Sequence, residues 1–153
     1  MRKRIYTDTS VIGGCLDSEF ESGSSALLAT FNEGSNIFVV SDLTLVELEN
    51  APPSVREILQ NVPVEYVEFV EFSEEASRLA DSYMAEGVIT RKSRVDAQHI
   101  AIATMNHVDV LVSWNFKHIV NLDRIHGYNS VNLKLGYPMI EIRTPTEVLN
   151  YEN

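Results

Sequence analysis

The chain has 153 residues, of which 44% are hydrophobic and 22% charged, proportions that are ordinary for a globular protein and argue against a disordered chain. Its formal net charge of −10 argues against a protein that coats nucleic acid nonspecifically, because neutralising phosphates requires lysine and arginine. An enzyme that acts on nucleic acid is not excluded, since bound cations can offset an acidic site.

A chain of this length fits one domain, and we expect a single domain over residues 1–153. Cys15 is the one cysteine, so a disulfide framework is excluded and a reducing compartment is favoured. Arg2, Lys3 and Arg4 resemble the start of a secretion signal, but no apolar segment follows them. No hydrophobic run is long enough to span a membrane, and we therefore expect a cytoplasmic protein with no membrane partner.

Apolar runs that indicate strands alternate with helical patterns along the whole chain. The first predicted strand contains Ile5 and Tyr6 and ends at Asp8, and Gly13-Gly14 breaks the pattern after it. Further strands are predicted at 37–40, 64–72, 110–112 and 140–142. Helices are predicted over 24–31, 95–106 and part of 115–136.

Capping residues indicate where other helices begin. The expected starts are Ser41 or Asp42, Ser54 in a capping box with Glu57, Ser73, and Thr144 before Pro145. The alternation of strands and helices predicts an α/β fold in which helices cover both faces of a central, mostly parallel sheet.

Two polar segments directly follow predicted strands. Asp8 ends the first strand, and Ser113-Trp114-Asn115 follows the strand at 110–112. Binding sites in such folds lie at the carboxyl ends of the strands, so these residues are candidates for a site. Asp8 could instead be a turn residue that bonds its own backbone, and Trp114 is more typical of a core than of a base-stacking platform.

Two further acids lie on predicted helices. Glu47 could point inward, although an exposed helical glutamate is the commoner case. Asp96 opens a helix that is apolar nearly all round, where a carboxylate is expected to be paired or metal-bound, or else to form a capping box with Ser93. His99 follows three residues later and is either a base or ligand, or a hydrogen-bonded histidine of the core or surface.

Carboxylates that lie close together repel one another unless a cation sits between them. The chain offers oxygen ligands and no Cys/His ligand set, so the expected metal is Mg²⁺ or Mn²⁺. Such ions activate water and stabilise displacement at phosphate. The candidates for substrate binding are Ser10, Ser113, Lys117, Arg91 and Arg94. The basic members of this set could equally be solvated loop charges.

Four segments, in their order and spacing, resemble the PIN domain family, and within it the VapC-type toxins and their relatives. The segments are Tyr6-Thr7-Asp8-Thr9-Ser10, Val46-Glu47-Leu48, Val95-Asp96-Ala97 with Ile100-Ala101 and Ala103, and Leu111-Val112-Ser113-Trp114-Asn115. The resemblance covers roughly residues 4–145. It implies a three-layer α/β/α sandwich, a Mg²⁺ or Mn²⁺ site, and a toxin that cleaves RNA endonucleolytically and has an antitoxin partner.

The resemblance also implies roles for individual residues. Asp8, Glu47 and Asp96 correspond to the family's catalytic, metal-binding acids, and Ser10 matches the polar residue that commonly follows the first acid. Asn115 stands where the family often has a further aspartate, so we expect it to contribute to the site without charge and metal binding to be weaker.

The family frequently forms homodimers, and we expect one here. The helical residues Leu27, Leu28 and Phe31 offer a face for it, unless they belong to the core.

Two other functions remain open. A PIN-like module that binds RNA or protein, with weak or no nuclease activity, is favoured by Asn115 and the acidic net charge. A receiver-like phospho-acceptor domain also places an aspartate at a strand end. It is disfavoured because the sequence has no well-placed lysine and no pair of acids beside the first strand.

Overall fold

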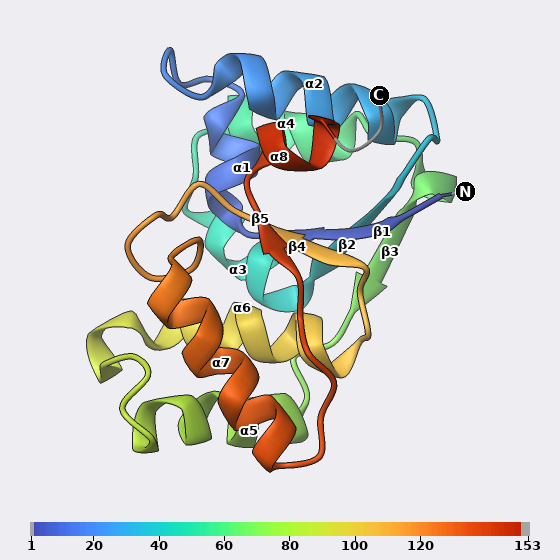
Figure 1. Cartoon of the computed structure of the whole chain (residues 1–153). Coiled ribbons are helices and arrows are strands. Elements are labelled where there is room, and N and C mark those ends of the chain that lie inside the picture. The colour runs from blue at the N-terminus through green and yellow to red at the C-terminus, as the bar shows by residue number, and fades with distance from the viewer. Residues whose placement is uncertain (1, 151–153) are drawn as a thin grey trace.

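Five strands form the central sheet of the computed structural model, which describes residues 2–150 (Figure 1). The strands are β1 (Arg4–Thr7), β2 (Ile37–Ser41), β3 (Val67–Val70), β4 (Val110–Val112) and β5 (Ile142–Arg143). Their order is β3-β2-β1-β4-β5, and each neighbouring pair is parallel. The predicted parallel sheet is confirmed, and Asp8 follows its central strand.

Helices cover both faces of this sheet and complete the predicted three layers. They are α1 (Thr9–Gly14), α2 (Glu21–Asn32), α3 (Asp42–Glu49), α4 (Pro53–Gln60), α5 (Glu74–Ala85), α6 (Arg94–Met105), α7 (Leu122–Lys134) and α8 (Pro145–Asn150). In Figure 1, α1, α2, α4 and α8 lie over one face, and α5, α6 and α7 lie over the other. None of the helices within residues 2–150 is both long and apolar enough to cross a membrane.

Successive side chains of each strand point to opposite faces of the sheet, and the core therefore has two parts. Ile5 and Phe38 pack in the part that includes residues of α1, α2 and α4, whereas Tyr6 and Val39 pack with residues of α5, α6 and α7. All four side chains are fully buried, as expected for a parallel sheet that is covered on both faces. Because Tyr6 points toward the α6 layer, its hydroxyl can reach groups that this helix carries.

Three helix starts follow the prediction. The side chains of Ser41 and Ser73 each accept a hydrogen bond from the backbone N–H three residues later, at 3.2 and 3.1 Å, and so cap α3 and α5. Before α8, the backbone N–H of Thr144 donates to the Glu147 carboxylate (3.0 Å), and the N–H of Glu147 donates to the Thr144 hydroxyl (3.2 Å). This reciprocal pair is a capping box.

The two capping boxes predicted from spacing are wrong. Helix α4 begins at Pro53 after Pro52, so Ser54 lies inside the helix and cannot cap it with Glu57. Ser93 does precede α6, but its side chain makes no capping hydrogen bond. A 3-10 turn, η2 (Arg91–Ser93), leads directly into α6, and the φ and ψ of Ser93, −111° and 30°, are not the extended values that a capping serine needs.

Some predicted boundaries also change. Gly13 and Gly14 do not break the chain but form the last residues of α1. The strand predicted at 64–72 is shortened to β3, because a 3-10 turn, η1 (Val64–Tyr66), follows Pro63. The last strand is β5, which starts at the end of the predicted 140–142 segment.

The helical face expected to support a homodimer belongs to the core. Leu27 and Phe31 on α2 are 0% exposed and Leu28 is 4% exposed. Phe31 also stacks on Phe38 of β2, with ring centroids 4.4 Å apart. The stated surface for a homodimer is therefore inside the protein.

The adjacent glycines at the end of α1 offer a matched test of packing. A Cβ added to Gly14 would lie 2.5 Å from Ser24 Oγ and 2.9 Å from Trp114 Nε1, whereas a Cβ on Gly13 would meet nothing within 4 Å. We expect Gly14→Ala to lower the free energy of unfolding by about 1–3 kcal/mol. Gly13→Ala should leave it unchanged or raise it by up to about 1 kcal/mol. Urea denaturation measures both, and equal effects would contradict this packing.

Candidate functional site

Asp8 lies at the carboxyl end of the central strand and is 5% exposed. It is the N-cap residue of α1, and its backbone N–H donates to the carbonyl of Val112 (3.4 Å) at the end of β4. Ser113 directly follows β4. Parallel pairing of β1 and β4 therefore brings Asp8 and Ser113 to the same edge of the sheet, as the sequence predicts.

Both carboxylate oxygens of Asp8 accept a hydrogen bond from a serine. Ser10 Oγ donates to Oδ1 (2.6 Å), and Ser113 Oγ donates to Oδ2 (2.7 Å). The same serine oxygens accept backbone N–H groups, from Trp114 to Ser10 (3.0 Å) and from Asn115 to Ser113 (2.9 Å). The two serines, expected to bind substrate, thus use their hydroxyl protons to orient the Asp8 carboxylate.

The three predicted acids share one electrostatic neighbourhood. Burial raises the pKa of Asp8, against the opposing effects of His99 and of the serine hydroxyls, and the charge of Glu47 adds to the increase. Burial likewise raises the pKa of Asp96, and the negative charges of Asp8 and Glu47 raise it further. Each ionised carboxylate therefore disfavours ionisation of its neighbours, which is the condition that a bound cation relieves.

Glu47 occupies the edge of this neighbourhood, on α3. Its Oε1 accepts a hydrogen bond from Thr9 Oγ1 (2.9 Å) and lies 2.6 Å from His99 Nε2. Burial alone would raise the pKa of Glu47, but the hydrogen bond and charge of His99, together with the Thr9 hydroxyl, outweigh burial and lower it. A third of the Glu47 side chain is exposed, so the carboxylate combines a fixed inner oxygen with access to solvent.

His99 is the residue whose part in the site the sequence did not settle. It is 2% exposed, and both of its ring nitrogens are hydrogen bonded, Nε2 to Glu47 and Nδ1 to the hydroxyl of Tyr6 (2.6 Å). It is thus a hydrogen-bonded core histidine that also contacts a predicted catalytic acid. Its position three residues after Asp96, on one helix face, was the available signal.

Asp96 lies in the first turn of α6 and is partly buried. Within residues 2–150, its carboxylate makes no hydrogen bond, so both oxygens are free to bind a ligand. The positive charge of a protonated His118 opposes the increase in the pKa of Asp96, which places this histidine near the acid. The Nδ1 atom of His118 is buried and has no hydrogen-bond partner among the described residues.

Asn115 forms a local turn through its side-chain oxygen. Its Oδ1 accepts the backbone N–H groups of Lys117 (3.2 Å) and His118 (2.9 Å). The side chains of Lys117, Arg91 and Arg94 are exposed, and none has a partner within the described part of the chain. The basic residues are therefore available to a ligand. Asn115 fixes the backbone of the loop that carries Lys117 and His118.

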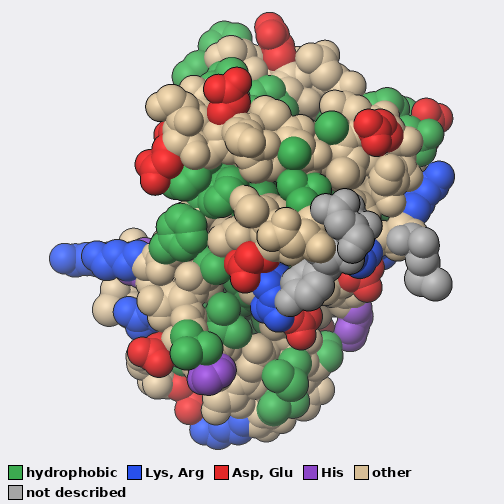
Figure 2. All heavy atoms as spheres, turned by 45° about the horizontal axis from the view of Figure 1, so that its top comes forward, with side chains coloured by type: hydrophobic (Ala, Val, Ile, Leu, Met, Phe, Trp, Pro, Cys, Tyr) green, Lys and Arg blue, Asp and Glu red, His purple; other side chains and the backbone are tan. Residues whose placement is uncertain are grey.

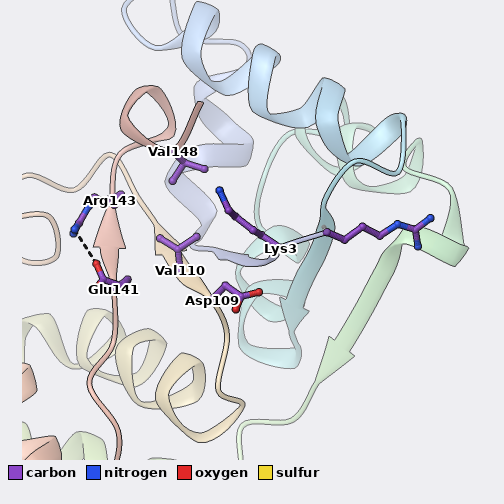
Figure 3. Close-up of a pocket in the computed structure, with 7 residues that line it drawn as sticks. Lys3, Asp109, Val110, Glu141, Arg143 and Val148 are labelled. Carbon is purple, nitrogen blue, oxygen red and sulfur yellow. Dashed lines mark ion pairs between the residues drawn. The ribbon is translucent and has the colours of Figure 1, made fainter. Parts of the chain in front are cut away.

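One pocket lies beside this site, and another lies away from it. One is lined by Ser10, Gly13, Gly14, Asp17, Phe20, Trp114 and Asn115, next to Asp8. Trp114 stacks on Phe20 there, with ring centroids 4.6 Å apart, and its Nε1 donates to Ser24 Oγ (2.8 Å), so it packs as expected. Another pocket is lined by Arg2, Lys3, Asp109, Val110, Glu141, Arg143 and Val148 (Figure 3). It lies at the amino end of β4, away from the acids.

The carboxylate oxygens at the sheet edge are the kind of ligand that a hard divalent cation prefers. Among residues 2–150, no group of three or more His, Cys, Asp or Glu side chains could hold a metal directly. The Asp8 and Asp96 carboxylates nevertheless offer oxygen ligands in a crowded, partly buried setting. Magnesium typically takes one or two carboxylates and keeps several waters, so two acids suffice for it.

Three solved structures that resemble this fold contain VapC-type proteins. They are VapC20 of Mycobacterium tuberculosis, a sarcin-ricin loop cleaving toxin, DNA-bound VapBC of Salmonella typhimurium, and VapBC2 of Rickettsia felis bound to a promoter DNA fragment. Their identities to this chain are 15%, 17% and 15%, with TM-scores of 0.55, 0.54 and 0.55. The matches cover 74%, 95% and 92% of this chain and 91%, 99% and 98% of the matched chains.

These likenesses show that the chain has the PIN-type fold of VapC toxins, as its sequence motifs predict. No protein-family model and no curated protein sequence matches the chain.

Asp96 should destabilise the metal-free protein at neutral pH. Its folded pKa is raised above the ordinary 3.8, so the folded chain binds the proton more tightly than the unfolded chain does. This loss of stability is absent below pH 3.8 and develops as the pH rises through the folded pKa of Asp96. We expect Asp96→Asn to raise the free energy of unfolding in chelator at pH 7, and the gain to vanish toward pH 4. The exposed Asp81→Asn is the control, and a loss of stability in Asp96→Asn at pH 7 would contradict the crowding of these acids.

Proposed function

We propose that this chain, which has the VapC-type PIN fold, is a divalent-metal-dependent endoribonuclease and the toxin of a toxin–antitoxin pair. The observation that carries the proposal is the pair of crowded carboxylates, Asp8 and Asp96, at the carboxyl edge of a parallel sheet. Such carboxylates are a cost to the fold unless they bind a cation, and functional sites are where strongly perturbed acids gather. The resemblance of the fold to VapC20, a sarcin-ricin loop cleaving toxin, supports RNA as the substrate.

Asp8 and Asp96 would hold Mg²⁺ or Mn²⁺ directly, and Glu47 would act on the cation through a water molecule that the cation binds. A bound divalent cation supplies positive charge for a phosphate oxygen and lowers the pKa of water, which favours in-line displacement. Ser10 and Ser113 hold the Asp8 carboxylate in one orientation by donating to both of its oxygens. Glu47 Oε2, which has no hydrogen-bond partner within residues 2–150, is the oxygen that can accept a proton from the attacking water.

The substrate backbone would bind the exposed cations Lys117, Arg91 and Arg94 beside the acids. On the face shown in Figure 2, the described Lys and Arg side chains lie in small groups among acidic and hydrophobic ones instead of forming one stripe. This distribution, with a net charge of −10, fits local recognition of a phosphate group better than binding along an extended nucleic acid.

A protein partner is proposed from the same comparisons. The Salmonella and Rickettsia structures contain VapBC complexes, so we propose an antitoxin that binds this chain. We also retain the homodimer as a proposal, although Leu27, Leu28 and Phe31 cannot form its surface. The proposed location is the cytoplasm, where RNA and an antitoxin would both be present.

The second candidate function is a PIN-like module that binds RNA or protein without cleaving it. The position of Asn115 favours it, because the side-chain oxygen already accepts two backbone N–H groups and adds no charge to the site. Binding of RNA or Mn²⁺ without cleavage would support this function.

Asp96→Asn should abolish RNA cleavage while preserving the fold. The substitution keeps the size of the side chain and removes a charge that the cation needs. We expect purified wild-type protein to cleave RNA in Mg²⁺ or Mn²⁺ and to stop in chelator. The exposed Asp81→Asn is the matched control and should cleave normally. Metal-dependent cleavage by pure Asp96→Asn protein at the wild-type rate would show that Asp96 is not a metal-binding catalytic acid.

Asn115→Asp should raise the affinity for Mn²⁺ measured by calorimetry. A carboxylate can accept the same two backbone N–H groups, so the turn should persist while the site gains a negative charge. Asn32→Asp, at an exposed position at the end of α2, is a control for net charge. An Mn²⁺ affinity unchanged by Asn115→Asp would show that Asn115 does not face the site.

A further inference from the structure

A continuous series of buried hydrogen bonds leads from the sheet to Glu47. Ser41 Oγ lies 2.8 Å from the Tyr6 hydroxyl, which lies 2.6 Å from His99 Nδ1. On the other side of the same ring, His99 Nε2 lies 2.6 Å from Glu47 Oε1. The series joins β2, β1, α6 and α3, so it crosses three elements before it reaches the acid.

The interior members of this series are almost inaccessible to water. Tyr6 and Ser41 are 0% exposed and His99 is 2% exposed. A buried polar group without a hydrogen-bond partner destabilises the fold by about 1–3 kcal/mol. Loss of any hydrogen bond in the series would therefore destabilise the protein. The imidazole is therefore held at both nitrogens and has no freedom to rotate away from Glu47.

When Glu47 is ionised and the His99 ring is neutral, counting protons gives the series one direction. The carboxylate can only accept, so His99 Nε2 must carry the hydrogen and Nδ1 of the neutral ring must accept. The Tyr6 hydroxyl then donates to Nδ1, and its oxygen accepts from the Ser41 hydroxyl. Ser41 Oγ in turn accepts the backbone N–H of Thr44 (3.2 Å). Each hydroxyl and imidazole hydrogen of the series then has an acceptor, and no buried charge other than the carboxylate is needed. Thr44 Oγ1, 3.3 Å from Ser41 Oγ, is a further partner at the far end of the series.

We infer that His99, held in place by Tyr6 and Ser41, is a positioning residue that fixes Oε1 of Glu47 and leaves Oε2 as the oxygen available to the site. The inference rests on the proposed function, because that function has Glu47 act on the cation through water and accept a proton. Thr9, which also donates to Oε1, makes the same oxygen doubly occupied (2.9 Å). Groups that orient a metal-binding carboxylate in this way typically change metal affinity or activity by about 10–100-fold when removed.

Tyr6→Phe is the most selective test, since it removes only the hydroxyl that holds His99 Nδ1. Tyr83→Phe is its matched control. Tyr83 is also 0% exposed and lies in the same half of the core, but its hydroxyl donates to Asn132 Oδ1 (2.5 Å) and does not reach Glu47. Loss of a buried hydroxyl should destabilise both variants similarly, so a difference between them reports on Glu47.

His99→Leu and His99→Gln form a second pair. Both lose the imidazole, but the glutamine amide can still donate to Glu47 Oε1 from a position close to that of Nε2. We expect His99→Leu and Tyr6→Phe to lower kcat by about 10–100-fold with little change in KM for RNA, and to weaken Mn²⁺ binding. His99→Gln should recover part of the loss, and Tyr83→Phe should match wild type.

The tautomer of His99 gives a readout that does not depend on activity. Long-range ¹H–¹⁵N NMR of the metal-free wild type, recorded where the His99 ring is neutral, should show hydrogen on Nε2 and none on Nδ1, and Tyr6→Phe should weaken that preference. An Nδ1–H tautomer in wild type would overturn the direction of the series and the inference with it.

The remaining outcomes separate this inference from the proposed function. If wild type cleaves RNA and folded Tyr6→Phe and His99→Leu keep its kcat and its Mn²⁺ affinity, His99 does not position Glu47, while the nuclease stands. If wild type neither cleaves RNA nor binds Mn²⁺, the proposed function fails. The positioning of Glu47 is then also overturned as a catalytic arrangement, even where NMR shows the expected tautomer.

Discussion

The rest of the site depends on one constraint, the burial of the Asp8 carboxylate at the end of the central strand. A carboxylate that is 5% exposed must be supplied with hydrogen-bond donors, and Ser10 and Ser113 meet this need from two different elements. Their oxygens are in turn held by backbone N–H groups of the loop after β4. The ends of β1 and β4 are thereby locked together around one negative charge.

The three acids differ in how many of their carboxylate oxygens are held by hydrogen bonds. Asp8 is held at both oxygens and Glu47 at one, while Asp96 makes no hydrogen bond within residues 2–150. Because the pKa values of Asp8 and Asp96 are raised and that of Glu47 is lowered, the environments separate a pair that favours a cation from an acid that remains ionised without one. The first pair can hold a cation, and an ionised carboxylate with a free oxygen can accept a proton.

The sequence predicted the sheet well because its buried strands are short apolar runs, as at 37–40 and 110–112, and it placed Asp8 and Ser113 at strand ends for the same reason. It could not show that Ser10 and Ser113 serve Asp8, since that depends on side-chain rotamers. The Tyr6–His99 contact spans 93 positions and depends on how α6 packs on β1. The Ser93 capping box failed because spacing does not reveal the 3-10 turn that sets the backbone angles of Ser93.

The hydrogen bond between Ser113 and Asp8 joins residues 105 positions apart, and this separation has a consequence for biosynthesis. The ribosome delivers β1 and β2 early, but the second neighbour of β1 is β4, which follows about seventy residues after β2. Until that segment emerges, one side of the central strand stays open and Asp8 lacks one of its donors. A ribonuclease of the proposed kind would be synthesised beside its own messenger RNA. A site that closes only after most of the chain has been made would keep such a nascent polypeptide inactive until its synthesis is nearly complete.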